Sequence, residues 1–544
     1  MAYQTSPGIS VTEVDLTTVV PAVSTTTGGI AGVFPWGPTL TPILVSSEVD
    51  LVRRFGKPIT GCNVETFFTA ADFLAYGNSL YVVRAESGNV ATPAGTGSAG
   101  DLTGFSAKFP GSYGNSLKVQ ALSFSAYDAA SNTTYVALKG AGRVVNGKPS
   151  ESDKLHIVII DEDGVFTGVQ NTILEVYENV SINEGAKKAD GTNNYWVEVL
   201  NAASNYVKVE SPDVSQFNSA LSFSFEGGDN GADENTVAAG PILAAYDKFA
   251  NPEEIDVSLI MRGVAKTVIS GEGAIAAYIA RICESRMDSL AFASPAKETV
   301  ILNNVPNVNA RTDIITWSDA VATAAGDTRV QSYLVLDSGY KYRYDRYNDT
   351  YVYTPLNGDI AGLCAHTDEL RDPWFSPAGY NRGGIKNIIK LAYNPSKADR
   401  DELYKVSVNP VITQPGQGTI LFGDKTSVRV ASAFDRINVR RLFIVLEKAI
   451  TRASRTTLFE FNDEFTRAQF RNLIEPFLRD IQGRRGIYDY KVVCDETNNT
   501  PEIVDRNEFV GDIYIKPARA INFIRLNFVA VRTGVEFEEI IGQR

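Results

Sequence analysis

Apolar and polar residues alternate along the first 85 residues in a rhythm that predicts successive strands and helices. Short runs of β-branched and other apolar residues favour strands at 30–34, 41–45 and 80–85. Apolar residues spaced three and four positions apart favour helices at 47–55 and 65–76. A serine just before the first of these helices, Ser46 or Ser47, supplies an N-cap.

The same rhythm returns after residue 234. The pattern predicts helices at 244–249 and 273–286, and strands at 257–262 and 290–294. A strand, a helix and a strand of these lengths form a βαβ unit, which builds a parallel sheet. We therefore expect one α/β domain that is made from two separated stretches of chain.

The stretch between these two parts is richer in Gly, Ser, Thr and Asn and predicts an inserted β-rich domain. Alternating segments favour strands at 116–124, 133–138, 154–161 and 220–225. Asp161-Glu162-Asp163-Gly164 is typical of a hairpin turn, and residues 172–179 predict one helix.

Both ends of the chain have the composition of extended arms. The N-terminal segment SPGISVTEVDLTTVVP is rich in β-branched residues, and residues 521–531 are apolar on both faces of a predicted strand. A strand that is apolar on both faces must be covered. We expect the arms to join neighbouring chains by strand exchange, through Ile9, Val11, Val14, Ile521, Phe523, Leu526 and Phe528.

Two amphipathic helices precede the C-terminal arm. The first covers 434–455. The second covers 464–482, with Asn462 or Asp463 as its N-cap, and we expect Pro476 to kink or divide it. At ~100° per residue, four cations of the first helix share a narrow sector, which we place opposite its apolar stripe. With two arginines of the second helix they form a candidate face for an acidic partner: Arg441, Lys448, Arg452, Arg455, Arg467 and Arg471.

These patterns predict an α/β and α+β multidomain fold. It has an α/β core with an inserted β-rich domain, a C-terminal α+β domain, and extended β arms at both ends. The expected boundaries are 1–22 for the N-terminal arm, 23–87 plus 235–400 for the core, 88–234 for the insert, and 401–544 for the C-terminal domain with its arm.

The tyrosine-rich segment YKYRYDRYNDTYVYT at 340–354 admits two interpretations. Alternating tyrosines that flank Tyr347-Asn348-Asp349 favour a hairpin with cross-strand ladders. Tyrosines beside Arg343 and Arg346 could instead stack nucleic-acid bases. We favour the hairpin because the chain as a whole is acidic.

The charge of the chain is −13 and is unevenly distributed. The acidity argues against nucleic acid as the main partner. Residues 425–485 nevertheless hold 13 lysines and arginines against 7 aspartates and glutamates. Such asymmetry indicates one face that meets an acidic partner. No apolar run reaches the ~20 residues of a membrane span, and the N-terminus lacks the pattern of a secretory signal.

Side chains suited to catalysis or metal binding are scarce. Cys62, Cys283, Cys364 and Cys494 form no CxxC pair, so we expect four buried thiols. The histidines, His156 and His366, lack metal-site spacing, and Cys364 with His366 makes a poor nucleophilic dyad. Ser270-Gly271-Glu272-Gly273 precedes a predicted helix but lacks the third glycine of a dinucleotide motif. We predict no catalytic residue, no cofactor and no metal.

The chain resembles the tail sheath protein of contractile-tailed (myovirus) bacteriophages. The resemblance rests on motifs spread over nearly the whole length: SPGI, FPWGP, EVDLVRRFGKP, YGNSLYVVRA, FPGSYGNSLKV, YKYRYDRYND, DIAGLCAHTD, WFSPAGYNRG, FDRINVRRLF and CDETNNTPEIVDRNEF. The stretch from 86 to 234 is the least diagnostic. The segment between Ala85 and Phe109 is short, which implies that an outward-facing domain of larger relatives is lacking here.

The resemblance implies a structural role and no enzymatic activity. It implies a helical homopolymer of stacked rings around a tail tube, with the C-terminal domain inside, the insert outside and the arms adding strands to neighbouring sheets. On this arrangement we expect the six cations of the candidate face to be tube-facing and to meet an acidic surface of the tube. Contraction would drive the tube through the host envelope for genome ejection. The implied partners are other copies of the chain, the tube, the baseplate and the terminator or neck proteins, without direct contact to nucleic acid or membrane. The implied location is the virion, after assembly in the host cytoplasm.

Two alternatives remain at this point. The first is the sheath of a genome-free contractile particle, such as a tailocin or an injection system. The second is an enzyme or a ligand-binding α/β protein, which would require a convergent acid-base or nucleophile cluster that the sequence does not display.

Overall fold

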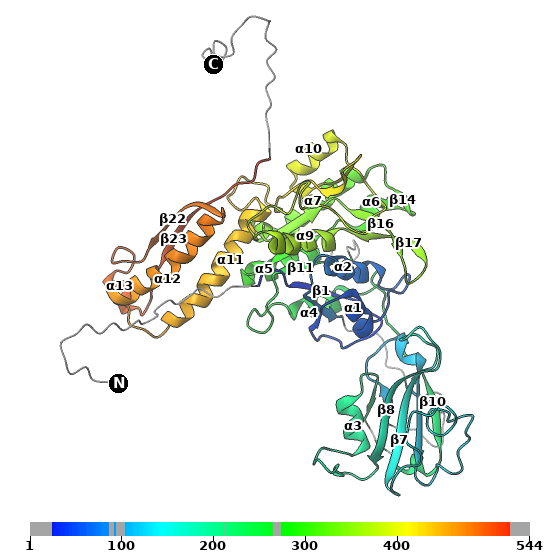
Figure 1. The fold of residues 1–544 in the computed structure, drawn as a ribbon. Coiled ribbons are helices and arrows are strands. Elements are labelled where there is room, and N and C mark those ends of the chain that lie inside the picture. The colour runs from blue at the N-terminus through cyan, green and yellow to red at the C-terminus, as the bar shows by residue number, and fades with distance from the viewer. Residues whose placement is uncertain are drawn as a thin grey trace, which may run out of the picture.

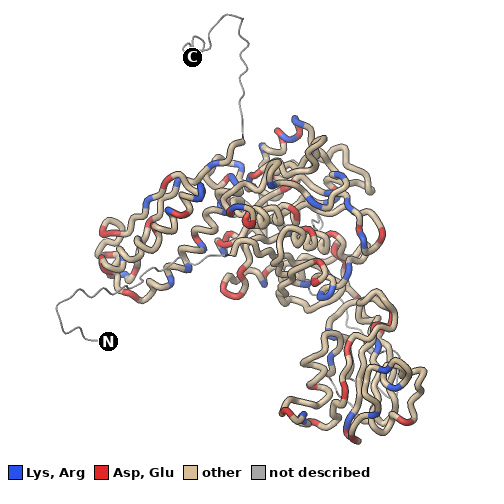
Figure 2. Tube along the Cα trace, viewed as in Figure 1, with Lys and Arg blue, Asp and Glu red and all other residues tan. Residues whose placement is uncertain are grey.

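A computed structural model describes residues 24–85, 92–93, 104–210, 212, 214–264 and 274–522. Figure 1 shows three units: a central core, an inserted domain below it, and an elongated C-terminal unit at the side. Acidic and basic residues are interspersed over all three (Figure 2). The predicted α/β and α+β multidomain class is confirmed. The predicted arms, with Ile9, Val11, Val14, Phe523, Leu526 and Phe528, lie outside the described residues.

The core contains a seven-stranded sheet in the order β19-β15-β12-β11-β1-β3-β2. All neighbours are parallel except β2 and β3, which are antiparallel. The strands are β1 (Gly28–Gly32), β2 (Ile43–Val45), β3 (Leu80–Arg84), β11 (Leu259–Met261), β12 (Leu290–Ala293), β15 (Leu334–Asp337) and β19 (Val408–Asn409). Because β19 completes this sheet, the core extends past the boundary that we placed at residue 400.

Helices cover both faces of this sheet, as its apolar strands require. One face packs against α2 (Val64–Leu74) and α9 (Asn357–Leu370), and the other against α4 (Ala239–Asp247) and α5 (Ala274–Arg286). Glycines of β1 permit this close layering. A Cβ atom on Gly28 would lie 2.6 Å from the ring of Phe73 in α2.

The sequence predicted most of these elements to within a few residues. Helix α1 (Glu48–Phe55) begins as expected, because the Ser47 side chain accepts a hydrogen bond from the backbone N–H of Asp50. The tyrosine-rich segment is the expected hairpin, β16 (Tyr340–Asp345) with β17 (Thr350–Pro355), in which Tyr342 stacks on Tyr351. Smaller elements complete the core: α6 (Lys297–Val300), α7 (Ala310–Ala325), α8 (Thr328–Ser332), α10 (Lys397–Lys405), β13 (Ile301–Leu302), β14 (Val305–Pro306), β18 (Lys390–Leu391), β20 (Val411–Gln414) and β21 (Gly418–Leu421).

The inserted domain is built on an antiparallel sheet of order β4-β10-β6-β7-β8. Its elements are β4 (Thr92–Pro93), β5 (Phe105–Ala107), β6 (Leu117–Ser123), β7 (Lys154–Asp161), β8 (Thr172–Ser181), α3 (Trp196–Ala203), β9 (Val207–Val209) and β10 (Leu221–Glu226). Two predictions are wrong here. Residues 172–179 lie in strand β8 because their β-branched and aromatic side chains suit pairing with β7. Residues 133–138 form turns, and the expected strand is absent.

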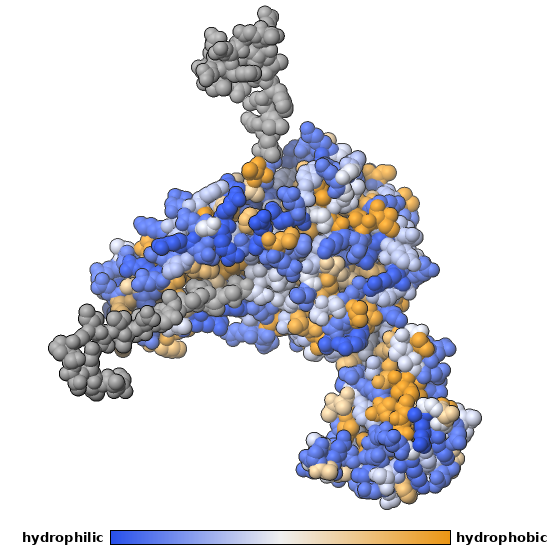
Figure 3. Space-filling model, viewed as in Figure 1, coloured by the Kyte–Doolittle hydropathy of each residue, from blue (hydrophilic) through white to orange (hydrophobic). Residues whose placement is uncertain are grey.

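A narrow neck joins the inserted domain to the core (Figure 3). Trp36, which follows β1 of the core, is buried there and meets Phe109 and Phe166 edge-on, with ring centroids 5.4 and 5.1 Å away. The hydroxyl of Tyr113 accepts a hydrogen bond of 2.7 Å from the backbone N–H of Lys57. The two parts therefore share packed contacts as well as covalent connections.

We call residues 437–522 the C-terminal unit. It contains α11 (Ile437–Ser454), α12 (Glu464–Gly483), α13 (Pro501–Asp505) and the hairpin of β22 (Ile487–Val493) with β23 (Asp512–Pro517). Asp463 caps α12 as expected, through a 2.8 Å bond from the N–H of Thr466. Pro476 does not divide the helix, which continues through it. Proline has no N–H to donate to the carbonyl four residues earlier in the helix. Because this part of α12 is exposed, water can bind that carbonyl instead.

Candidate assembly interface

Helix α11 lies between two hydrophobic clusters. Leu442 and Leu446 pack with α12 and the C-terminal hairpin. Ile437 and Ile444 instead belong to the hydrophobic cluster of the core. At ~100° per residue, Arg441 and Lys448 fall on the same face as Ile437 and Ile444. Arg441 and Lys448 therefore face the core. They lie opposite the stripe of Leu442 and Leu446, as expected, but this second side of the helix is buried and cannot meet a partner.

Arg441 makes the most deeply buried ion pair of this junction. Its side chain is 4% exposed, and its Nη2 lies 2.5 Å from Oδ2 of Asp368, which is 5% exposed and belongs to α9. The same oxygen accepts a 2.5 Å hydrogen bond from the hydroxyl of Thr25, and Arg441 also donates to the carbonyl of Cys364. Burial raises the pKa of Asp368, and the Arg441 guanidinium offsets only part of this effect.

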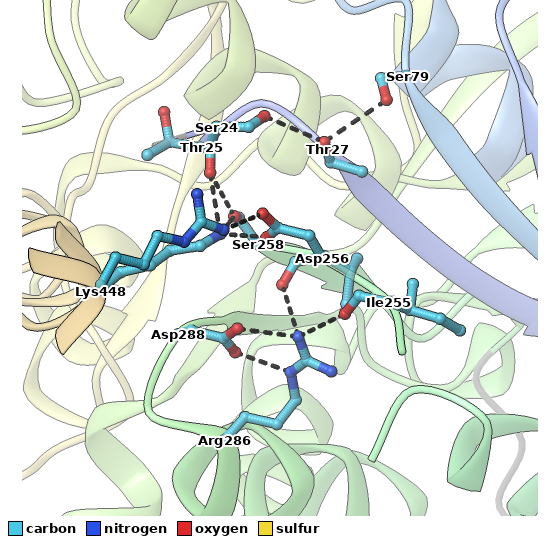
Figure 4. Close-up of polar contacts among 12 residues, drawn as sticks. Ser24, Thr25, Thr27, Ser79, Ile255, Asp256, Ser258, Arg286, Asp288 and Lys448 are labelled. Carbon is cyan, nitrogen blue, oxygen red and sulfur yellow. Dashed lines mark hydrogen bonds and ion pairs between the residues drawn. The ribbon is translucent and has the colours of Figure 1, made fainter. Parts of the chain in front are cut away.

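Lys448 makes a second connection about two turns further along α11 (Figure 4). Its Nζ forms an ion pair with Asp256 and donates a 3.0 Å hydrogen bond to the carbonyl of Ser24. Arg452 contacts the other carboxylate oxygen of Asp256 at 2.6 Å. Burial acts to raise the pKa of Asp256, but the two cations outweigh it and hold that pKa below its usual range.

The loop that carries Asp256 is itself held in place by Arg286 of α5. The guanidinium pairs with Asp288 at 2.7 Å and donates to the carbonyl of Ile255, the residue just before Asp256 (Figure 4). It also donates to the carbonyl of Phe249, at the start of the loop. The cations of α11 thus meet a pre-organised surface. Lys448 also binds the carbonyl of Ser24, the first described residue after the predicted N-terminal arm, and Thr25 shares Asp368 with Arg441.

The six predicted partner-facing cations therefore have different surroundings. Arg441 and Lys448 are buried and form ion pairs within the chain, so they cannot meet an external surface. Arg452 is partly exposed and forms an ion pair with Asp256. Arg455 is exposed at the end of α11, and Arg467 and Arg471 are half-buried on α12. In the sequence, Ile437 and Ile444 fall on the same side of α11 as Arg441 and Lys448. These two apolar residues were the signal that this side of the helix is buried.

The β22–β23 hairpin presents the second feature of an assembly surface. One face packs on α12 through Tyr490, Val492, Ile513 and Ile515, while Tyr488 and Tyr514 are exposed. Among the described residues, each of its two strands pairs only with the other, so both outer edges have free backbone groups. Ile521, the one predicted arm residue within the described chain, is 83% exposed.

An apolar turn that the sequence analysis missed connects α11 to α12. Leu458, Phe459, Phe461 and Phe465 are all largely exposed, and Phe459 has a positive φ of 70°. The three phenylalanines fall within seven residues, and this density was the signal available in the sequence. Exposed apolar residues gathered in this way are typical of interaction sites.

Catalytic and metal-binding groups do not gather in the part of the chain that the structure describes. The four cysteines are buried free thiols, as predicted. Across the described ranges, no group of three His, Cys, Asp or Glu residues could hold a metal ion. None of the described helices combines the length and apolarity needed to cross a membrane. Residues 270–273 lie outside the described residues.

Comparison with known proteins identifies three domains of one family. The chain matches the phage tail sheath C-terminal domain at 430–530, the phage tail sheath protein central domain at 235–427, and the tail sheath protein Gp18 domain III N-terminal region at 25–85. It is 32% identical to the tail sheath protein of Enterobacteria phage T4, over 99% of both chains. That alignment spans 668 positions, so the T4 protein carries segments that this chain lacks.

Two solved structures have the same fold at low sequence identity. A sheath tail protein from Desulfitobacterium hafniense superposes with a TM-score of 0.55 at 11% identity, covering 94% of this chain and 100% of that one. The sheath of an extracellular contractile injection system in its contracted state gives a TM-score of 0.52 at 13% identity, covering 99% and 100%.

Proposed function

This chain belongs to the phage tail sheath protein family, and on that premise we propose that it polymerises into a helical sheath around a tail tube. Contraction of this sheath drives the tube through the host envelope for genome ejection. Its partners are further copies of itself, the tube protein, the baseplate and the terminator or neck proteins. It assembles in the host cytoplasm, becomes part of the virion and performs no catalysis.

The observation that carries this proposal is the open β22–β23 hairpin. A two-stranded sheet is marginally stable alone and gains from further strands. The terminal arms have the composition of strands, and strand addition supplies main-chain hydrogen bonds. An arm from one copy added to the hairpin of another is a head-to-tail contact, which builds open helical assemblies. Such links also survive when the bodies that they join rotate between two packings.

Removal of residues 1–20 tests the arm model. The truncated protein keeps its fold but no longer forms tubes or rings in electron micrographs. A finer test compares Phe523→Asp, which places a charge on an apolar arm position, with Arg525→Asp on the same face as its matched control. Only the first variant loses polymerisation. Unchanged polymers from both the truncation and Phe523→Asp contradict strand exchange.

We also retain part of the predicted tube-facing surface. Arg455, Arg467 and Arg471 make no ion pair with another described residue, and they lie on the two helices that lead to the exposed phenylalanine turn. Contacts of exposed charges contribute only ~0–1 kcal/mol each, so they can align a sheath on a tube and still release it. Arg441 and Lys448 are excluded from this surface because they are buried.

Charge reversal separates this tube contact from self-assembly. The pair Arg455→Glu and Arg471→Glu leaves sheath polymers intact but reduces the number of sheathed tubes. The matched control is Arg479→Glu on the exposed face of α12. Normal extended tails from the double variant refute the tube-facing assignment.

The genome-free particle remains the second candidate. The injection-system structure shares the fold, but at 13% identity that likeness says nothing about cargo. The 32% identity to a phage protein favours the virion. Purified particles that lack DNA-filled heads would favour the alternative.

A further inference from the structure

A wide groove lies between the core and the C-terminal unit. Its volume is about 1440 Å³. The core contributes Trp374, Phe375, Phe422 and residues of α10, and the C-terminal unit contributes Ile487, Tyr488 and residues 518–522. The last described residues of the chain therefore form part of its wall.

The groove is strongly basic. Its walls include seven cations: Arg382, Lys397, Arg400, Lys405, Lys425, Arg485 and Arg519. Asp401 and Asp424 are its only acidic residues among those described, and Asp424 is already paired with Arg436 at 2.8 Å. None of the seven cations forms an ion pair with another described residue.

Aromatic rings lie beneath several of these charges. The Arg400 guanidinium lies 5.3 Å from the ring centroid of Phe422, Arg382 lies 5.6 Å from Phe375, and the Lys425 ammonium lies 4.3 Å from Tyr404. Burial, with a smaller contribution from the neighbouring Arg436, lowers the pKa of Lys425. A ligand for this groove must supply negative charges interleaved with apolar side chains.

The C-terminal segment of this chain has that composition. Residues 534–541 read GVEFEEII, with Glu536, Glu538 and Glu539 beside Phe537, Ile540 and Ile541, and they include no cation. Asn522, the last described residue of the groove wall, precedes Glu536 by 14 residues. At up to ~3.3 Å per residue, this length reaches back into the same groove or into that of an adjacent copy.

We propose that residues 534–541 of this protein dock in the basic groove between α10 and the C-terminal hairpin. The glutamates meet the unpaired cations, and Phe537 with the isoleucines covers the aromatic floor. The docked segment holds the core and the C-terminal unit together from outside, while α11 joins them from within. This docking does not depend on strand exchange by residues 521–531.

Photo-crosslinking in the full-length protein tests the docking. Phe537→p-benzoylphenylalanine is irradiated, and the linked peptides are mapped by mass spectrometry. We expect links to 397–405, 422–425 and 485–488. Mixing isotope-labelled and unlabelled chains reports whether the segment comes from the same or another copy, and either source supports docking. Links to other surfaces, or none, overturn it.

Charge variants supply a second measurement. Lys397→Glu with Arg400→Glu reduces the crosslink yield roughly tenfold, since two reversed surface pairs together are worth ~1–2 kcal/mol. The matched control reverses the exposed Lys187 and Lys188 of the inserted domain and leaves the yield unchanged. Adding Glu538→Arg and Glu539→Arg to the groove variant restores the yield. Failure of this restoration, in protein with a native circular dichroism spectrum, contradicts the proposal.

Discussion

Replacement of Arg441 by methionine measures how firmly α11 is held on the core. The variant leaves the carboxylate of Asp368 buried with only the Thr25 hydroxyl as its partner. Removing one partner of a buried ion pair costs about 3–5 kcal/mol, because the remaining charge is uncompensated. We therefore expect Arg441→Met to lower the free energy of unfolding by about this amount at neutral pH.

The assay is chemical denaturation of the unpolymerised protein, followed by circular dichroism and by tryptophan fluorescence, to which Trp374 beside α12 contributes. Arg441→Met with Asp368→Leu removes both charges and returns most of the lost stability, since an apolar pair of similar volume substitutes well for a buried ion pair. The matched control, Arg479→Met on the exposed face of α12, changes stability by at most ~0.5 kcal/mol.

The penalty also depends on pH with a definite sign. Burial raises the pKa of Asp368, and loss of Arg441 raises it further. The folded variant then binds a proton that the unfolded chain releases as the pH rises above about 4. The deficit of Arg441→Met is therefore smaller at pH 4 than at pH 7. A loss below ~1 kcal/mol at pH 7, or a double variant as unstable as the single one, refutes the assignment of this pair as the anchor of α11.

Three further expectations concern the core and the cysteines. Burial raises the pKa of Asp337 to about 8, so its contribution to stability is present below pH 4 and is lost as the pH rises toward 8. Asp337→Asn flattens this part of the stability profile, and a variant with the wild-type slope contradicts the assignment. Gly358→Ala places a Cβ 2.4 Å from the carbonyl of Thr69 in α2 and costs about 1–3 kcal/mol in thermal unfolding, whereas Gly240→Ala, with open space around it, does not. The buried thiols stay unreactive toward a thiol reagent until the protein unfolds, so stoichiometric labelling of the native protein is the contrary result.

Local patterns in the sequence predicted the elements whose stability is local. The N-cap at Ser47, the cap at Asp463 and the tyrosine hairpin rest on contacts between residues close together in the chain, and the structure contains all three. Strand β8 was mistaken for a helix because its apolar residues satisfy a helical spacing as well. Pairing with β7 decided between the two forms.

The charged face of α11 could not be assigned from the helix alone. The acids that neutralise it, Asp256 and Asp368, lie 192 and 73 residues away from Lys448 and Arg441 along the chain. A periodic pattern shows which residues share a face, but it does not show what packs against that face. The same reason left the basic groove unseen, since its walls come from two separate units.

The packing at the neck has a consequence for how motion of the subunit can be observed. Trp36 is inserted between Phe109 and Phe166, and Gly111 lies so close to Pro35 that a Cβ there would clash with its carbonyl oxygen. The inserted domain is therefore a lever fixed to the core. A dye attached to its far end would travel through a larger arc than the core itself, so small rotations could be followed optically in single particles.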